Sequence, residues 1–113
     1  MNFSQDLIRG SITPIVLSLL SDRPMYGYEM VKQVHARTGG QLEWKEGTLY
    51  PALHRLESDG LVKAAWKDVP DTGRKRKYYA LTGKGRRELA ARTNEWQQFT
   101  QAVDAILSVG GAA

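Results

Sequence analysis

The stretch GTLYPALHRLESDGLV, residues 47–62, carries the most distinctive side-chain chemistry in the sequence. Its leucines share one face of a predicted helix, which leaves the other face to a hydroxyl, a phenol, a proline ring, an imidazole and a guanidinium: Thr48, Tyr50, Pro51, His54 and Arg55. A face that only meets solvent more often carries Lys, Glu and Gln, which favour helix. Hydroxyl, imidazole and guanidinium groups can instead donate hydrogen bonds to phosphate oxygens or to base edges. We therefore interpret this face as a candidate binding surface.

The other reactive residue types indicate neither catalysis nor a metal site. The 113 residues include no cysteine, which excludes disulfides, thiolate metal sites and cysteine nucleophiles. His35 and His54 are far apart, with no matching carboxylate spacing, so we expect no metal site. There is no HExxH motif, and the glycines of TGKGRR lack the spacing of a phosphate-binding loop. We expect a protein that is not an enzyme and that holds no cofactor.

Positive charge gathers downstream of the candidate binding helix. The net charge is +4, and the range 73–92 holds a group of cations opposed only by Glu88: Arg74, Lys75, Arg76, Lys77, Lys84, Arg86, Arg87 and Arg92. A charged run by itself is often only a solvated loop. Beside a candidate recognition helix, it indicates a polyanionic partner.

Two further helices are predicted before residue 46. Residues 7–20 place apolar side chains at helical spacing around Pro14, so either Thr13 caps a helix that begins at this proline or a longer helix bends there. Residues 28–34 form a second amphipathic pattern, which the glycine pair at 39–40 ends.

The third helix contains the binding surface. Its buried face is formed by leucines at i, i+4 and i+7: Leu49, Leu53 and Leu56. Pro51 is tolerated only in a first helical turn, where backbone N–H groups have no helical partner, so the helix begins near residues 46–48. Gly60 is the expected stop.

Two extended stretches follow, LVKAAWKD (61–68) and RKYYALT (76–82), joined by VPDTGRK, whose proline and glycine favour turns. The first alternates apolar with polar side chains, and its Trp66 is expected to pack at the base of a hairpin. Alternation places one of Tyr78 and Tyr79 inside and the other outside. The pair predicts a β-hairpin with a basic tip.

The last segment, from residue 83 to about residue 109, has a heptad repeat with Arg92 as its one misfit. Its apolar positions form the predicted dimer interface: Leu89, Trp96, Phe99, Val103 and Ile106. A helix of this length extends about 38 Å, which is more than so small a domain can bury alone. We expect a second copy of the same helix to cover it.

Three helices followed by a hairpin predict a mainly α fold with a small β-hairpin wing: a winged helix-turn-helix over 1–82 and a C-terminal dimerisation helix over 83–113. The third helix then enters the major groove and its neighbours meet phosphates. Of Tyr26 and Tyr28 we expect one in the core, and we favour Tyr26 as the more exposed, phosphate-contacting residue. The predicted DNA-binding residues are Tyr26, Lys45, Thr48, Tyr50, Pro51, His54, Arg55, Arg74, Lys75, Arg76 and Lys77.

Two features of the sequence bear on the cellular location of the protein. The sequence has no apolar run of the roughly 18 residues that suggest a membrane span. Its N-terminus is not that of a secretory signal. A cytoplasmic protein without a membrane partner is the expectation.

Three segments, YGYEM, GTLYPALHRLESDGLV and GRKRKYYALTGKGRREL, resemble the signature of the PadR family of bacterial transcriptional regulators. The resemblance runs from about Ile8 to Leu107. It implies a homodimeric winged-helix repressor, often autoregulatory, that binds double-stranded operator DNA and leaves it when a small molecule binds.

The single C-terminal helix is similar to the short branch of this family, which includes multidrug-sensing members. In that branch a tryptophan, matched here by Trp96, faces its symmetry mate and flanks a flat apolar pocket. The resemblance thus implies a planar aromatic or phenolic effector near Trp96 and Phe99. The alternative for Trp96 is plain packing in the dimer interface, where aromatic residues are common.

Two functions therefore remain open from the residues alone. One is a ligand-responsive repressor that binds a palindromic operator as a homodimer through the third helix and the basic wing. The other is a winged-helix module that docks the wing on an acidic protein partner. The salt dependence of binding distinguishes the two functions, because DNA binding releases counterions and weakens steeply as ionic strength rises.

Overall fold

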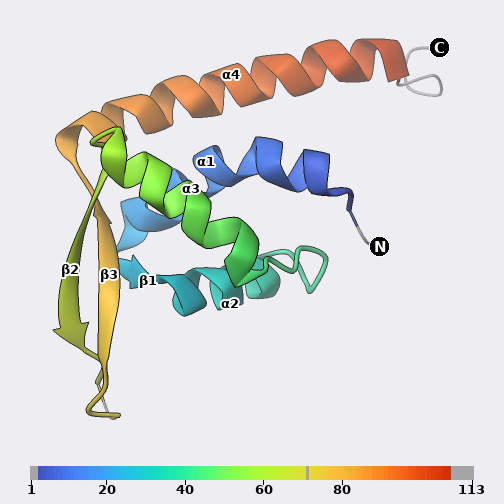
Figure 1. Ribbon diagram of the computed structural model, residues 1–113. Coiled ribbons are helices and arrows are strands. Elements are labelled where there is room, and N and C mark those ends of the chain that lie inside the picture. Colours follow the sequence, from blue (N-terminus) through green and yellow to red (C-terminus); the bar gives the residue numbers. More distant parts are fainter. Residues whose placement is uncertain (1–2, 71, 108–113) are drawn as a thin grey trace.

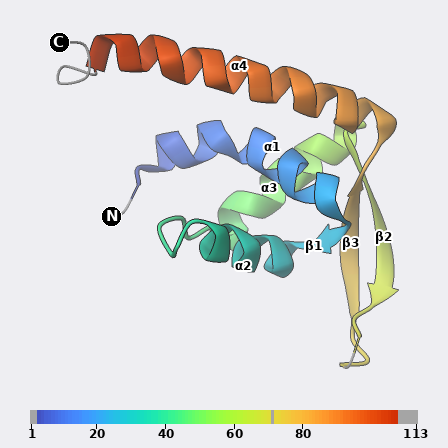
Figure 2. The ribbon, with the colours of Figure 1, turned by 180° about the vertical axis from the view of Figure 1, so that it is seen from behind.

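The computed structural model describes residues 3–70 and 72–107, which form four helices and a three-stranded sheet. Their order is α1 (Gln5–Asp22), β1 (Met25–Tyr26), α2 (Gly27–Arg37), α3 (Glu46–Ser58), β2 (Val62–Asp68), β3 (Lys75–Leu81) and α4 (Gly83–Leu107). The first three helices pack together, the β2–β3 hairpin projects beside them, and α4 runs from the base of the hairpin along α1 (Figure 1). The rear view shows the same arrangement (Figure 2). The predicted mainly α class with a small wing is confirmed.

The first helix is the longer of the two alternatives. The Ser4 side chain caps it by accepting a hydrogen bond from the Leu7 N–H at 3.4 Å, and Pro14 lies inside the helix. Its buried face consists of Ile12, Val16, Leu17, Leu19 and Leu20. The helix thereby supplies the centre of the core against which α3 packs.

The third helix lies as its leucines predict. Leu49 and Leu53 have no exposed surface, and Leu56 is only 2 % exposed. The helix begins at Glu46 and ends at Ser58, so Pro51 is its sixth residue and lies inside the helix, past the first turn predicted for it. Gly60 then adopts a φ of 75°, a left-handed conformation that glycine accepts without steric cost.

The sheet contains one strand that the sequence pattern does not reveal. Besides the expected hairpin, the short strand β1 pairs with β3, so the strand order is β1-β3-β2. A strand of two residues is too short to show any alternation. Tyr79 is buried and Tyr78 is only half-buried, so these neighbours point to opposite faces as predicted.

The expected burial of Trp66 is wrong. The predicted alternation along β2 is seen only in its first half, where Val62 is buried, Ala64 is half-buried and Lys63 and Ala65 are exposed. The outer half of the hairpin, however, extends past the helices (Figure 1). Trp66 lies on that half and keeps 68 % of its surface exposed.

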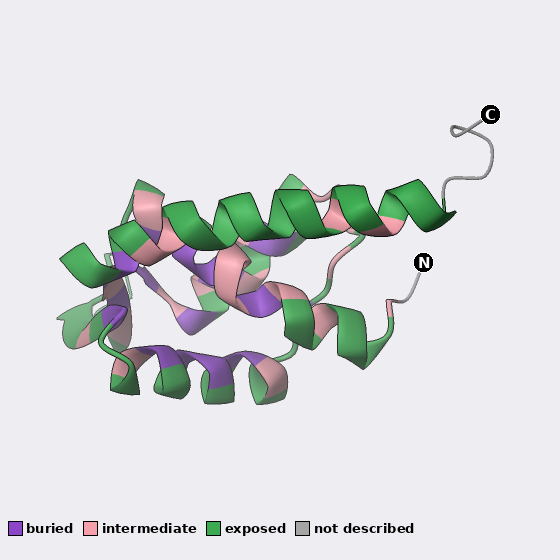
Figure 3. Ribbon diagram, turned by 90° about the horizontal axis from the view of Figure 1, so that it is seen from above, coloured by how far each residue is buried: buried purple, intermediate pink, exposed green. Residues whose placement is uncertain are grey.

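Helix α4 is most closely covered near its beginning, and farther along Thr100 and Val103 are half-buried. Gly85 is its single buried residue, and Leu89 packs partly against the core of its own chain. Most of the remaining helix is exposed (Figure 3). The heptad pattern predicts that Leu89 faces a second copy, but the first turns of α4 rest on the winged domain and cover much of it. Residues 108–113 of the predicted C-terminal segment lie outside the described residues.

Candidate nucleic-acid interface

The exposed face of α3 lies directly opposite its buried leucine stripe. Helical steps of 100° place Gly47, Pro51, His54 and Ser58 along its outermost line, and all four are exposed. Three of these contribute no side chain or a short one. His54 is therefore the outermost ring with hydrogen-bonding nitrogens on the helix.

One flank of this face is held against the beginning of α2. A Cβ placed on Gly27 would lie 2.6 Å from the Tyr50 hydroxyl oxygen, so the phenol fits only because residue 27 lacks a side chain. Burial, and after it the charge of Glu46, raises the pKa of Tyr50 above its ordinary value. The Tyr50 hydroxyl therefore stays protonated at neutral pH and remains able to donate a hydrogen bond.

A groove runs between this flank of α3 and the hairpin. Its volume is about 530 Å³. We call it the wing groove, and it is lined by Tyr26, Gly27, Tyr28, Glu46, Tyr50, His54, Trp66, Lys75, Arg76, Lys77 and Tyr79. It brings side chains from α2, α3 and the hairpin together, among them six that the sequence predicts as DNA-binding: Tyr26, Tyr50, His54, Lys75, Arg76 and Lys77.

The other predicted residues of α3 lie on its opposite flank. Thr48, Pro51 and Arg55 line a separate hollow of about 280 Å³ between α3 and α1. Arg9 of α1 reaches the same hollow and forms an ion pair with Asp6 at 2.5 Å. Arg9 is absent from the predicted DNA-binding residues, because only the packing of α1 against α3 makes Arg9 a neighbour of the exposed α3 residues. Lys45 is the exposed residue directly before α3, and its carbonyl oxygen accepts the Thr48 and Leu49 N–H groups at 3.0 Å each.

The interpretation of the tyrosines at the start of α2 needs correction. Neither lies in the core, and Tyr28, 51 % exposed, is more accessible than the half-buried Tyr26. Pairing of β1 with β3 sets Tyr26 beside Tyr78, and the two rings meet edge to face with centroids 5.3 Å apart. The Arg76 guanidinium lies 5.9 Å from the Tyr26 ring centre. Tyr26 thus helps to position a wing cation.

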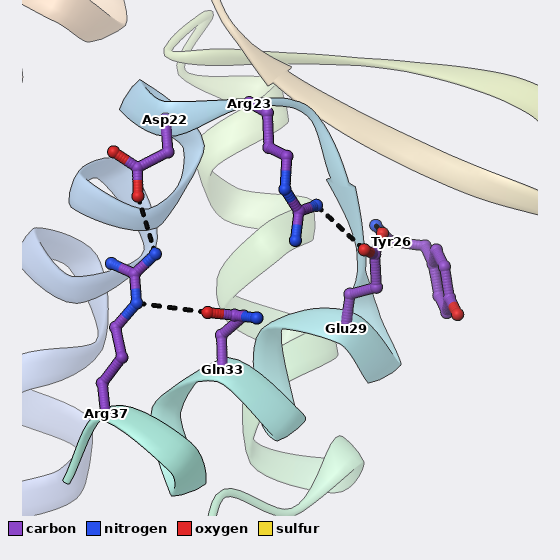
Figure 4. A network of polar contacts seen from close by, with 6 residues as sticks. All are labelled: Asp22, Arg23, Tyr26, Glu29, Gln33 and Arg37. Carbon is purple, nitrogen blue, oxygen red and sulfur yellow. Dashed lines mark hydrogen bonds and ion pairs between the residues drawn. The ribbon is translucent and has the colours of Figure 1, made fainter.

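Polar contacts fix the turn between α1 and α2 (Figure 4). Arg23 donates to a Glu29 carboxylate oxygen at 2.9 Å, and the other Glu29 oxygen accepts the Tyr26 N–H at 3.3 Å. Arg37 reaches back to Asp22 at 2.7 Å. The Glu29 contacts hold the beginning of α2 beside β1, where Tyr26 and Tyr28 line the wing groove, and the Arg37 contact ties the end of α2 to the end of α1.

The wing carries its cations as predicted. Arg74, Lys75 and Arg76 are exposed, whereas Lys77 is half-buried and lies 3.6 Å from Glu57 of α3. This ion pair links the hairpin to α3. It leaves the outer cations of the wing facing solvent.

Trp96 faces a different part of the molecule. It lines an apolar hollow of about 380 Å³ with residues of the N-terminal segment, α1 and the loop after α2: Phe3, Leu7, Ile8, Ser11, Ile15, Thr38, Gln41 and Leu42. None of these lining residues is charged. Phe99 does not line this hollow and is 61 % exposed.

Metal-binding clusters and membrane-spanning helices are both missing from the described part of the chain. Residues 3–70 and 72–107 contain no group of three or more His, Cys, Asp or Glu side chains placed to hold a metal ion. Within the same ranges, no helix has the length and apolar character needed to cross a membrane.

Comparison with known proteins gives a consistent result. The family model described as the transcriptional regulator PadR-like family matches residues 16–91. An uncharacterized protein of Lysinibacillus sphaericus is 36% identical over 102 residues, which are 90% of this chain and 93% of that protein. A transcriptional regulator of Mycobacterium tuberculosis is 35% identical over 81 residues, 72% of this chain and 71% of that protein.

Solved structures agree. A transcriptional regulator from Clostridium thermocellum superposes with a TM-score of 0.80 at 34% identity, covering 91% of this chain and 96% of that one. A PadR family transcription regulator from Clostridium difficile gives a TM-score of 0.73 at 37% identity, covering 87% and 99%. The family consists of transcriptional regulators, not enzymes. On the fold, with its third helix and wing, and on these matches, the chain belongs to the PadR-like family of transcriptional regulators.

Proposed function

We propose that this PadR-family regulator is a ligand-responsive repressor that binds a palindromic operator as a homodimer through α3 and the wing. The observation that carries the proposal is the wing groove. There the exposed flank of α3, with Tyr50 and His54, faces the wing cations Lys75 and Arg76 across one hollow. A helix with donors on its exposed side suits the major groove, and cations beside it suit phosphates.

The dimer is supported by apolar surface that the chain leaves uncovered. Along α4, Phe99 is 61 % exposed and Ile106 is 82 % exposed, and Leu7 of α1 is exposed as well. Soluble monomers rarely leave such side chains together in the open. Covering them with a second copy places two α3 helices about a twofold axis. Such a pair matches an inverted repeat whose half-sites are about 34 Å apart.

The effector is supported by the hollow at Trp96. Its lining offers an indole, aliphatic side chains and the neutral polar groups of Ser11, Thr38 and Gln41. A flat aromatic or phenolic molecule fits this chemistry because it stacks on indole and can hydrogen-bond at its edge. Ligand binding releases DNA only if the ligand prefers a dimer with the wrong spacing of its two α3 helices.

Selection from a random duplex DNA library tests the proposal. The wild-type protein is expected to enrich inverted repeats, and its binding is expected to weaken steeply with salt. A variant with His54→Ala and Arg55→Ala should still bind DNA but enrich no sequence. If the wild type enriches nothing and binds acidic polypeptides as well as it binds DNA, the repressor assignment is wrong.

A further inference from the structure

The outer half of the hairpin exposes an indole that the fold does not need. Trp66 is the most exposed of the aromatic side chains in the described residues, at 68 %. The hairpin is already held by seven paired positions between β2 and β3, and its base is closed by the buried Val62 and Tyr79. Exposed apolar side chains that gather in one patch, unlike single scattered ones, mark an interaction surface.

The proposed dimer does not cover this ring. The large exposed apolar side chains fall into two groups, and the first lies on α1 and α4: Leu7, Trp96, Phe99, Ile106 and Leu107. The second group consists of Tyr28, Tyr50 and Trp66, and all three line the wing groove. The hairpin points away from α4, so a partner copy on α4 leaves this second group open (Figure 1).

Strand register explains where Trp66 points. It shares a face of β2 with the buried Val62, and it pairs across the sheet with Lys77. The alternation that turns Val62 into the core therefore turns Trp66 toward α3, where His54 and Tyr50 form the opposite wall of the groove.

The charge around the ring favours an anionic partner. Lys75, Arg76 and Lys77 line the groove with Trp66, whereas Glu46 is its single acidic lining residue. Lys77 is engaged by Glu57 at 3.6 Å, which leaves Lys75 and Arg76 as the exposed cations beside the indole. An apolar ring with an N–H donor, in one groove with two exposed cations, suits a surface that alternates apolar and anionic groups.

We propose that Trp66 contacts duplex DNA, with its ring packed on a deoxyribose and its Nε1–H donated to the adjoining phosphate. The inference rests on the proposed DNA-binding function and adds to it a contact that does not depend on charge. The sugar–phosphate backbone presents an apolar sugar next to each anionic phosphate, which matches the two ends of an indole. Such a contact holds the wing in position and reads no sequence.

Binding of a fluorescein-labelled 24-base-pair duplex, followed by anisotropy over a range of salt concentrations, tests the inference. Trp66→Ala is expected to weaken binding about tenfold, as removal of a well-covered aromatic anchor does. Its slope of log affinity against log salt should stay unchanged, because every cation remains in place. Lys75→Ala, the matched control on the facing strand, should weaken binding and also flatten the slope.

Trp66→Phe keeps a ring for the sugar but has no N–H, so its affinity should lie between those of wild type and Trp66→Ala. Because the side chain is exposed, both variants should keep the wild-type circular dichroism spectrum and melting temperature. Wild-type affinity in Trp66→Ala at every salt concentration would overturn the inference, while wild-type DNA binding would still uphold the proposed function. If the wild type does not bind the duplex, both fail.

Discussion

Single residues decide how closely the elements around the proposed DNA-binding face approach one another. At Gly27 the absence of a Cβ lets the Tyr50 ring lie against the first turn of α2. That position buries part of the phenol, which raises the pKa of Tyr50, and turns the rest toward the wing groove. The position of Tyr50 on α3, and with it the shape of the wing groove, therefore depends on a residue that has no side chain.

Replacing Gly27 with Ala should move Tyr50 and destabilise the fold. The new methyl group would lie 2.6 Å from the Tyr50 hydroxyl oxygen. Overpacking of this kind costs about 1–3 kcal/mol of unfolding free energy, which urea denaturation would measure. Gly10→Ala is the matched control, because that exposed helical glycine has nothing within 4 Å of the added Cβ and should gain about 0.5–1 kcal/mol. Equal stability of wild type and Gly27→Ala would show that the phenol is not confined there.

At the scale of elements, the important joint lies between α4 and the turn that leads from α3 into β2. Thr82 donates its hydroxyl to the Gly60 carbonyl at 2.6 Å and accepts the Gly85 N–H at 3.0 Å. The Lys84 ammonium donates to the Asp59 carbonyl at 2.8 Å. These bonds couple the direction of α4, and hence of the proposed dimer, to the end of α3.

Gly85→Ala should break this joint. A Cβ at residue 85 would overlap the Leu61 carbonyl oxygen, which is backbone and cannot swing away. The expected results are a decrease of about 1–3 kcal/mol in unfolding free energy and weaker binding to a selected operator. Gly83→Ala, two residues earlier, is the control, since its nearest neighbour would be the flexible end of Arg87 at 3.7 Å. If both variants bind DNA equally well, α4 does not set the position of α3.

The elements also show what sequence patterns can and cannot predict. Helix α3 was predictable because Leu49, Leu53 and Leu56 repeat at helical spacing and are all buried. Strand β1 was not, because two residues carry no period, and its pairing decides how far Tyr26 is exposed. The burial of Trp66 was predicted wrongly because alternation gives the face of a strand but not how far the strand extends past the core. Arg9 was not predictable either, because α1 is far from α3 in the sequence and only their packing brings Arg9 to the hollow beside α3.

At the scale of the whole molecule, α4 extends along α1 and leaves most of its own residues exposed. The chain measures 57 Å along its longest axis and 21 Å along its shortest, and the larger part of α4 is exposed. The heptad positions Phe99 and Ile106 lie exposed on that helix. A second copy with the same positions offers the matching surface.

Phe99→Asp combined with Ile106→Asp should convert a dimer into a folded monomer. Both side chains are mostly exposed within one chain, so the substitutions should leave the fold intact and act only on the interface, where an unpaired buried charge costs several kcal/mol. Sedimentation velocity would report the mass. Gln101→Asp, on the outward side of the same helix, should remain dimeric. A double variant that stays dimeric would place the interface elsewhere.

Salt dependence of duplex DNA binding tests the central claim, that the wing and α3 form a DNA-binding surface, most directly. For a variant with Arg74→Ala, Lys75→Ala and Arg76→Ala, the slope of log affinity against log salt should fall by roughly one unit for each phosphate that the protein no longer neutralises. A variant with Arg86→Ala, Arg87→Ala and Arg92→Ala removes the same charge from α4, on the side away from the wing tip, and should keep the wild-type slope. Equal slopes for the wing variant and the wild type would contradict the assignment of the wing to DNA.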